Sequence, residues 1–429
     1  MCRLIPMFCL GLCLFVAGRC SAQGFVLSGS GPVNRSMGGA GTAAPLDSIG
    51  SLQWNPASIT RFETSRFDLA VETVFNRNTV ESGVGLGTMS EVRGSTSSDA
   101  GAAPLPTLGF IMPVEDTDIT LGLSLGAVGG FSVNFPADPT NPIFAPPSVG
   151  GFGAMYSKLS ILQVAPTLAV KVTDRFSVGV APTFSVAEVQ ASPFAFTAPN
   201  DADSDSTYTY PAGTGSQPTW GLGVQAGVHY QGDDWSAGFS IKSPQWFQSF
   251  KINAMNEAGL PLPLKTDLTC PMILSWGVAV EPTDRLLLAV DVRYVDYANT
   301  KLFGDSAGFA ADGSVTGLGW QSVFFTAVGV QFQATDWLSL RAGYSCSQNP
   351  VSDAAAMFSV QAPAVYQHLL SLGASCELTS RLTLSCAWVH GFDNSVTGAL
   401  ITPGGTQPAS IVRVSQVVDS AVVGMSYTF

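Results

Sequence analysis

Residues able to carry out chemistry are scarce in this sequence of 429 residues, of which 12% are charged and only three are histidines. His229, His368 and His390 lie far apart, and no serine near them has the sequence context of a hydrolase nucleophile. The sequence also contains no phosphate-binding glycine loop and no cluster of residues with the spacing of metal ligands. We therefore expect neither an enzyme nor a protein that holds a metal or another cofactor.

The charges of interest are seven that alternate with apolar neighbours, on the face of each segment that carries small or polar residues. They are Asp68, Glu72, Lys171, Lys242, Asp291, Arg293 and Arg341. Arg341 and Lys242 have no acid beside them on the same segment, which makes them candidates to bind a ligand carboxylate, because a buried carboxylate needs a cation or several donors. Arg293 is a weaker candidate, since Asp291 lies two residues away. The alternative is that all seven form ordinary ion pairs.

A period-two alternation of apolar and small or polar residues runs from Arg66 to the end of the chain and predicts β-strands. Six short turn signals, of the type Thr173-Asp174, separate consecutive alternating runs, as tight hairpin turns do. Six such turns join fourteen strands if both ends of the barrel lie on the same rim. The predicted strands are 66–78, 104–114, 117–128, 160–172, 175–189, 219–231, 234–246, 270–281, 285–297, 320–334, 337–347, 366–378, 381–391 and 415–429.

The final strand must pair with another strand, because its outward face is apolar and the chain ends at Phe429. Pairing with the strand near 66–78 would close a barrel and remove the last open edge. Scarce charge, against roughly 25% in soluble domains, and short turns on one rim with long loops on the other predict an all-β, transmembrane antiparallel barrel of 14 strands. A soluble β-sandwich would need more surface charge. The net charge of −12 argues against nucleic acid as a partner.

The chain divides into three parts. Residues 1–22 have the short positive start, the apolar stretch and the small-residue cleavage site of a signal peptide. Residues 23–64 lack alternation and are rich in glycine and serine, which predicts a compact segment enclosed by the rest. Residues 65–429 form the barrel.

Two long loops, 129–159 and 247–268, are unusually apolar. Large exposed apolar patches generally mark binding sites, so we expect these loops to pack together as a landing groove for a hydrophobic ligand. The alternative is that their side chains only pack against one another and hold a plug over the mouth. The residues expected in the groove are Phe131, Phe135, Phe144, Phe152, Phe250, Leu260 and Leu262.

Three stretches resemble the FadL-type outer-membrane transporters of long-chain fatty acids and other hydrophobic compounds. They are the segment from Gly24-Phe25 through Gly41 to Trp54-Asn55-Pro56-Ala57, the hairpin 268–294, and the strand ending in Phe429. The resemblance implies a monomeric outer-membrane barrel of the Gram-negative type, plugged by an N-terminal hatch, that binds a fatty acid or hydrocarbon. It further implies contact with outer-membrane lipid and recognition of Phe429 by the outer-membrane assembly machinery.

The resemblance also gives expectations for two details. Asn55, Pro56 and Ala57 match the hatch motif of the family, and we interpret them as structural, since proline fixes φ and asparagine can bond to nearby backbone. An inward bend of the third strand would open a lateral route to the membrane, and Gly122, Gly126, Gly129 and Gly130 would suit it. The competing functions are a general or polar-solute pore and a mainly structural barrel.

Overall fold

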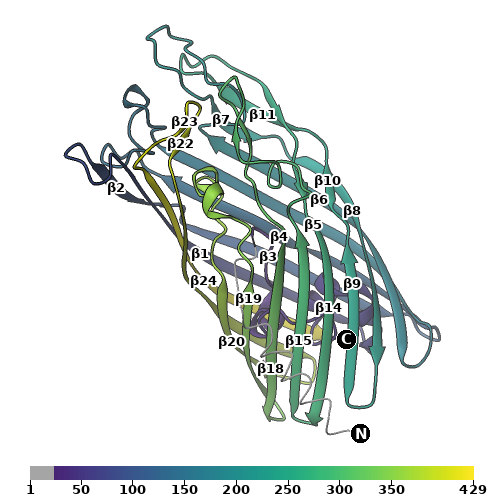
Figure 1. Cartoon of the computed structure of the whole chain (residues 1–429). Helices are drawn as coiled ribbons and strands as arrows, with labels where there is room; N and C mark the ends of the chain where they lie inside the picture. The colour runs from purple at the N-terminus through teal and green to yellow at the C-terminus, as the bar shows by residue number, and fades with distance from the viewer. Residues whose placement is uncertain (1–23) are drawn as a thin grey trace.

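The computed structural model describes residues 24–429, so the predicted signal peptide lies outside the described residues. Fourteen antiparallel strands form one closed barrel, as the sequence predicts (Figure 1). These wall strands are β1 (Arg66–Val84), β3 (Ala102–Pro113), β4 (Ile119–Phe135), β5 (Met155–Lys171), β6 (Phe176–Ser192), β8 (Thr219–Gln231), β9 (Trp235–Lys242), β14 (Met272–Thr283), β15 (Leu286–Asp296), β18 (Val323–Thr335), β19 (Leu338–Ser347), β20 (His368–Glu377), β21 (Leu382–Gly398) and β24 (Ile411–Thr428).

The first and last strands close the wall, which confirms the predicted pairing of the C-terminal strand. β1 and β24 run in unbroken register from Arg66 opposite Thr428 to Gly83 opposite Ile411. The backbone N–H of Phe429 donates to the carbonyl of Ser65 over 3.0 Å, so the chain end is tied to the rim with the short turns. A barrel closed in this way leaves no strand edge unpaired in lipid.

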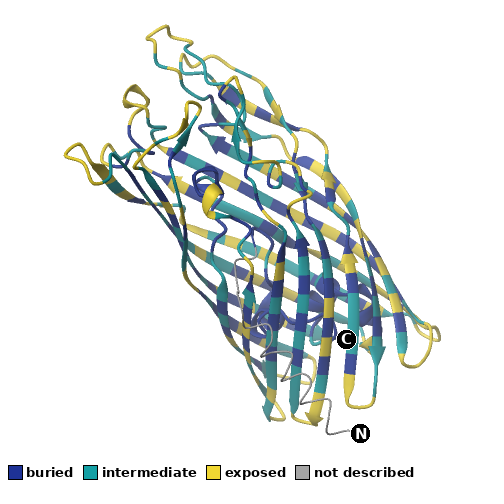
Figure 2. Cartoon of the chain, in the orientation of Figure 1, coloured by how far each residue is buried: buried dark blue, intermediate teal, exposed yellow. Residues whose placement is uncertain are grey.

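Side chains alternate between the two faces of the wall as predicted, which Figure 2 shows as bands of buried and exposed residues along each strand. In β6, Val178, Val180 and Phe184 are exposed on the outside, whereas Ser177 and Thr183 are buried on the inside. An apolar outer face and a small or polar inner face are what a lipid-embedded barrel requires. No helix among the described residues is long and apolar enough to span a membrane.

Several wall strands differ in length from the predicted ones. β1 continues beyond residue 78, β21 continues beyond residue 391, and β24 begins before residue 415. These longer strands extend the wall above the apolar band. The predicted strand 234–246 ends earlier, at Lys242. Pro244 follows, and because proline has no N–H it cannot continue the ladder. The strand resumes as the short β10 (Gln245–Phe247).

Residues 24–64 lie inside the barrel, where nearly all of them are buried, and we call this segment the hatch. It contains α2 (Gly31–Ser36), α3 (Ser48–Trp54) and the 3-10 helix η1 (Pro56–Arg61). The Asp47 side chain caps α3 by accepting a hydrogen bond from the Gly50 N–H over 3.0 Å. The predicted plug inside the lumen is thereby confirmed as part of the fold.

The remaining elements belong to the long loops at the rim opposite the short turns, above the level of the hatch (Figure 1). They are β2 (Val92–Ser97), η2 (Pro147–Val149), β7 (Ala212–Ser216), β11 (Phe250–Met255), β12 (Leu264–Thr266), β13 (Thr269–Cys270), β16 (Gly308–Phe309), β17 (Val315–Gly317), η3 (Asp353–Ala355), η4 (Met357–Ser359), β22 (Ile401–Thr402) and β23 (Gly405–Thr406).

Candidate functional site: a chain of cavities from the mouth to the wall

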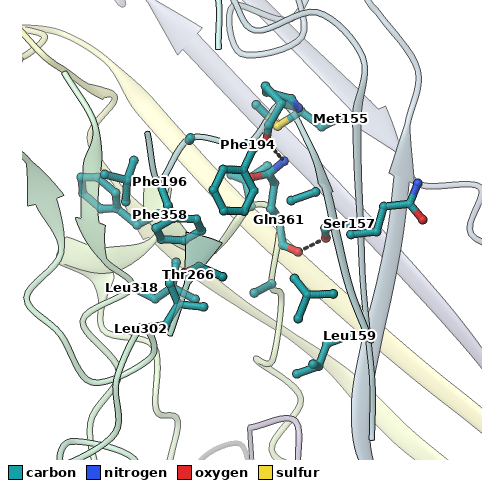
Figure 3. Close-up of a pocket in the computed structure, with 18 of the residues that line it drawn as sticks. Met155, Ser157, Leu159, Phe194, Phe196, Thr266, Leu302, Leu318, Phe358 and Gln361 are labelled. Atoms are coloured by element: carbon teal, nitrogen blue, oxygen red, sulfur yellow. Dashed lines mark hydrogen bonds between the residues drawn. The ribbon is translucent and has the colours of Figure 1, made fainter. Parts of the chain in front are cut away.

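An apolar cavity of about 900 Å³, including its open mouth, lies among the long loops, and we call it the groove (Figure 3). Its labelled lining includes Met155 and Leu159 of β5, Phe194 and Phe196 of the β6–β7 loop, and Phe358 of η4. The ends of several loops and strands therefore converge on one hydrophobic space. Such a concave apolar site with few polar groups suits a hydrophobic small molecule.

The structure brings only some of the predicted loop residues to this groove. Phe131 and Phe152 line it. Phe135 and Phe144 are fully buried and stack on each other with ring centroids 4.8 Å apart, away from the lining.

The residues named in the second loop are also outside the lining. Phe250 is fully buried and packs on Phe247, with ring centroids 5.5 Å apart. Leu260 is exposed, and the Leu262 N–H donates to the Ala254 carbonyl over 2.7 Å in a turn above β11. That loop reaches the groove through Thr266 and Leu268 instead. The loops therefore form a groove, as in the first expectation, and several of their apolar residues pack against one another around it, as in the alternative.

Three loops that sequence reasoning missed supply the other walls of the groove, namely those between β6 and β7, between β15 and β18, and between β19 and β20. The loop between β19 and β20 folds into the mouth, so that Met357, Phe358 and Val360 line the groove and are buried. The Gln361 side chain donates to the Pro193 carbonyl over 2.9 Å, and the backbone carbonyl of Gln361 accepts from the Ser157 hydroxyl (Figure 3). The apolar run in residues 354–366 was the available signal.

Aromatic rings form the floor between the groove and the hatch. Phe25, near the start of the hatch, lies 4.6 Å from Phe303, 5.5 Å from Tyr297 and 6.0 Å from Trp320, measured between ring centroids. The Val26 N–H donates to the Tyr297 hydroxyl over 3.2 Å. The hatch thus contributes one side chain, Phe25, to this partition, and the other rings come from the mouth loops.

Beyond this partition lie two more cavities that share Phe25 as a wall. The side cavity, about 530 Å³, also shares Phe131 with the groove. The inner cavity, about 430 Å³, contains Lys242 together with Cys270 and Ile273. Adjacent cavities with shared walls outline a route from the mouth to the barrel interior, with Phe131 between the groove and the side cavity and Phe25 between the side cavity and the inner cavity.

Lys242 is the predicted carboxylate-binding candidate that the structure places at a cavity. Its ammonium lies 5.2 Å from the centroid of the Trp54 ring, a cation–π contact. No hydrogen bond or salt bridge joins it to any residue in the described part of the chain. It is buried and lines the inner cavity, where no acid among the described residues contacts it.

The other two cations named from the sequence have partners. The Arg341 guanidinium donates to the Gln331 side chain and to the Ser375 hydroxyl, each over 2.6 Å, and it lines none of the described cavities. Arg293 forms a salt bridge of 2.9 Å with Asp291, the pairing that the sequence suggested, and stacks on Trp54 with its guanidinium carbon 3.4 Å from the ring centroid.

The hatch motif Asn55-Pro56-Ala57 ties the hatch to the wall. The Asn55 amide donates to the carbonyls of Thr42 and Val228, over 2.8 and 3.0 Å, and its oxygen accepts from the Ala57 N–H over 3.1 Å. Close approach is possible because the wall has no side chain here: a Cβ at Gly227 would lie 2.1 Å from the Asn55 oxygen. The contacts agree with a structural role for the motif.

Further ion pairs and hydrogen bonds hold the hatch at other points. The Asp291 carboxylate accepts from the backbone N–H of Gly41 over 2.9 Å and from the Thr42 hydroxyl over 2.7 Å. Arg35 of α2 forms a buried salt bridge with Glu72 of β1. Removing one partner of such buried pairs is strongly destabilising, so displacement of the whole hatch would cost much more than movement of Phe25.

The wall itself is incomplete between β3 and β4, at a place that we call the seam. These strands pair only from Thr107 opposite Gly126 to Pro113 opposite Thr120. Past Gly126 a β-bulge at Val128 redirects β4, which then pairs with the hatch: the Leu27 N–H donates to the Val128 carbonyl over 3.3 Å, and Gly129 bridges to Val26. Of the glycines singled out in the third strand, Gly126, Gly129 and Gly130 lie at this bend, whereas Gly122 lies in the regularly paired stretch opposite Ile111.

A small cavity of about 250 Å³ lies at the seam and shares three residues with the inner cavity: Gln53, Val128 and Gln163. Thr107 of β3 lines it on the other side. Above Thr107, β3 carries Pro104 and Pro106 yet keeps its ladder with β1. Their missing N–H donors therefore fall on the side that faces β4, and β3 has fewer donors with which to close the seam.

The outermost cavity, about 1190 Å³ with its open side, lies over the groove and shares Phe152 and Pro193 with it. Its Tyr210 stacks on Phe152, with ring centroids 5.9 Å apart, and donates to the Gly313 carbonyl over 2.6 Å. Burial and the negative charge of Asp312 raise the pKa of Tyr210 to about 12, so the hydroxyl stays protonated and remains a donor. This entrance is largely uncharged.

Comparison with known proteins identifies a matching family and solved structures of similar fold. The family profile described as outer membrane protein transport protein (OMPP1/FadL/TodX) matches residues 13–429. The fold resembles the toluene transporter TodX of Pseudomonas putida (16% identity, 94% of this chain and 99% of that one, TM-score 0.68) and a Pseudomonas aeruginosa FadL homologue (17%, 95% and 100%, 0.69). It also resembles the toluene transporter TbuX of Ralstonia pickettii (17%, 94% and 99%, 0.68).

Among curated protein sequences, none matches this chain with statistical significance. The solved structures share too little sequence to show more than the common fold, whereas the family profile covers the whole described chain. The resemblance that the sequence suggested is confirmed by that match. The chain belongs to the OMPP1/FadL/TodX family, and it is an outer-membrane transporter of hydrophobic compounds.

Proposed function

We propose that this protein takes up hydrophobic molecules bearing one carboxylate, with long-chain fatty acids as the cargo. The observation that carries the proposal is the unpaired ammonium of Lys242, which faces the inner cavity at the end of an otherwise apolar path. A charge held in that position favours an anion, since a carboxylate removed from water needs a cation. A cargo without charge would gain nothing from it.

The cavities suggest an order of events. Cargo enters the groove from the outermost cavity and displaces water from the apolar lining of the groove, which stabilises the bound cargo by roughly 25 cal/mol per Å² of apolar surface buried. Rotation of Phe25 and Phe131 then admits the carboxylate to the inner cavity, where Lys242 binds it while the tail remains among apolar side chains.

Exit through the seam is the simplest continuation. The inner cavity and the seam cavity share Gln53, Val128 and Gln163, and the upper part of β4 is already separated from β3. Lateral release into the bilayer keeps an apolar tail out of water throughout, and the buried ion pairs of the hatch stay intact.

The test is equilibrium binding of oleate and of an uncharged hydrocarbon of equal length to purified protein in detergent. Lys242→Met keeps the length of the side chain and removes its charge. We expect oleate affinity to fall by about tenfold or more, the loss of one charge-assisted hydrogen bond of about 1.5–3 kcal/mol, with hydrocarbon affinity unchanged. Arg341→Met is the matched control, because the Arg341 guanidinium has neutral partners and no cavity, and should leave both affinities unchanged.

Equal oleate affinity of Lys242→Met and the unchanged protein would contradict the assignment. Loss only in Arg341→Met would move the carboxylate site to that residue. A second class of cargo is monoaromatic hydrocarbon, since two of the similar structures are named as toluene transporters. Toluene binding that exceeds oleate binding and is indifferent to Lys242→Met would favour that class.

A general or polar-solute pore is the remaining alternative. The hatch fills the lumen, and the entrance above it is apolar, whereas a polar pore needs an open, charge-lined constriction. We therefore expect only small conductance in planar bilayers, and a steady large current would support the pore.

A further inference from the structure

The outside of the wall carries a group of cations that transport of a cargo does not use. We call Lys251, Lys265 and Lys301 the lysine cluster. They are half of the lysines in the sequence, whose full set is Lys158, Lys171, Lys242, Lys251, Lys265 and Lys301. In a chain of net charge −12 such a concentration of positive charge needs an explanation.

Two members of the cluster face each other directly. Lys251 of β11 and Lys265 of β12 are register partners in an antiparallel pair, and both side chains are exposed. Directly opposite residues have Cβ atoms roughly 5 Å apart, a spacing at which like charges destabilise the pair. On the other side of β11 the neighbour is the neutral Gln217, whose N–H donates to the Lys251 carbonyl over 3.3 Å. Within the described residues neither ammonium has a salt-bridge partner.

The third member has the only acid in contact with the cluster among the described residues. The Lys301 ammonium lies 2.9 Å from the Asp267 carboxylate, which also accepts a hydrogen bond of 2.6 Å from the Ser249 hydroxyl. Hydrogen bonds from Ser249 and Lys301 hold the pKa of Asp267 below its usual value, so the carboxylate stays ionised. Three cations and one anion leave two positive charges uncompensated.

The cluster sits at a definite height on the wall. The Lys301 N–H donates to the Thr269 hydroxyl over 2.8 Å, and Thr269 is the register partner of Trp246. Trp246, the register partner of Leu222, and Trp220, two residues further along β8, are exposed at the upper edge of the apolar band. Outward tryptophans mark the level of lipid headgroups, so the lysines lie where phosphate groups of outer-leaflet lipid would be.

We propose that the lysine cluster binds the phosphate of a phosphorylated glycolipid of the outer leaflet. A phosphate monoester placed between Lys251 and Lys265 would relieve their repulsion and accept a charge-assisted hydrogen bond from each. The same strands present Thr266 and Leu268 to the groove on their inner side. The bound lipid therefore braces one wall of the groove, whatever cargo the groove accepts.

The experiment titrates the full-length protein, in dodecyl maltoside micelles, with bisphosphorylated lipid A and counts bound lipid by native mass spectrometry. Lys251→Gln/Lys265→Gln should weaken lipid A binding roughly thirtyfold, at a factor of about five for each charge near an anionic surface. Arg175→Gln/Arg285→Gln is the matched control, which removes two exposed charges from the short turns at the opposite rim and should bind as the unchanged protein does.

Two further probes distinguish the source of the phosphate. Lipid A stripped of its phosphates should bind at least tenfold more weakly than the intact lipid, and inorganic phosphate should not compete at millimolar concentration. Equal binding by the lysine variant, equal binding of the stripped lipid, or full competition by inorganic phosphate would each overturn the proposal. Retention of the heat-sensitive electrophoretic mobility of a folded barrel verifies that the variant is folded.

Discussion

The junction of β1 with β24 and the junction of β3 with β4 belong to the same wall, but only the first is paired along its whole length. β1 and β24 are far apart in the sequence and keep one register from Arg66 to Gly83. β3 and β4 are joined by a short turn, yet their ladder ends at Thr107 opposite Gly126. Proximity in sequence therefore does not determine which junction closes.

Local chemistry explains the difference. Along the closing junction every residue has an N–H, so each ladder bond can form. At the seam the extra residue Val128 breaks the register, and Pro104 and Pro106 withhold donors. The stretch of the hatch around Val26 and Leu27, which we call the hatch strand, pairs with β4 in place of β3. A gap whose edges are satisfied from inside can persist in a membrane, where unpaired backbone groups are costly.

Deletion of Val128 is the strongest test of this comparison. It removes the bulge and lets β4 continue in register along β3, so that the seam resembles the β1–β24 junction. We expect uptake of labelled oleate by cells to fall to the level of cells lacking the protein, because the lateral exit is lost. Binding of oleate to the purified variant should persist, since Lys242 and most of the groove lining come from other strands and loops, although Val128 is itself one lining residue of the inner cavity.

The control is deletion of a residue from an exposed loop tip, for which Gly87 is suitable because no side chain or backbone group lies within 4 Å of a Cβ built there. Uptake by the Gly87 deletion should match that of the unchanged protein. Normal uptake by the Val128 deletion, with the barrel folded, would exclude the seam as the exit.

The wall was predictable from the sequence to a degree that the site was not. Strand 219–231 has the same limits in prediction and structure, because alternation reports which face of a strand meets lipid. The loops have no such period. Phe135 and Phe144 were as apolar as Phe131, but only contacts between distant segments determine that the first two stack on each other and the third lines the groove.

The same limit applies to the interior. The sequence could show that Lys242 has no acid on its own strand, as it could for Arg341. It could not show that Trp54 of the hatch would face Lys242, or that Gln331 and Ser375 would face Arg341. Gln331 and Ser375 lie on the two strands paired with that of Arg341, Gln331 as its direct register partner, whereas Trp54 comes from the hatch, which has no register to β9. The surroundings of Lys242 therefore appear only in three dimensions.

Replacement of both seam prolines should give the next largest effect. Pro104→Thr/Pro106→Thr restores two N–H groups that can pair with β4, each worth about 1 kcal/mol, so the closed seam should be favoured by roughly thirtyfold. We expect initial oleate uptake to decrease by a smaller factor, because β4 retains its bulge. Pro166→Thr is the control: it restores an N–H at the break in the ladder between β5 and β6, away from the seam, and should leave uptake unchanged. An equal decrease in both variants would point to folding yield instead of the seam.

The smallest effect is expected from the hatch side of the seam. Leu27→Pro removes the N–H that donates to the Val128 carbonyl, a single hydrogen bond of about 1 kcal/mol. This loss changes by a factor of about five the equilibrium between the state in which the hatch strand covers the edge of β4 and the state in which it does not. If the hatch strand covers the gap, uptake should rise or stay constant, in contrast to the decrease predicted for the proline replacements. Hydrogen exchange at Gly129 and Gly130 measures the same balance directly, and unchanged protection there would show that the hatch strand does not hold the edge of β4.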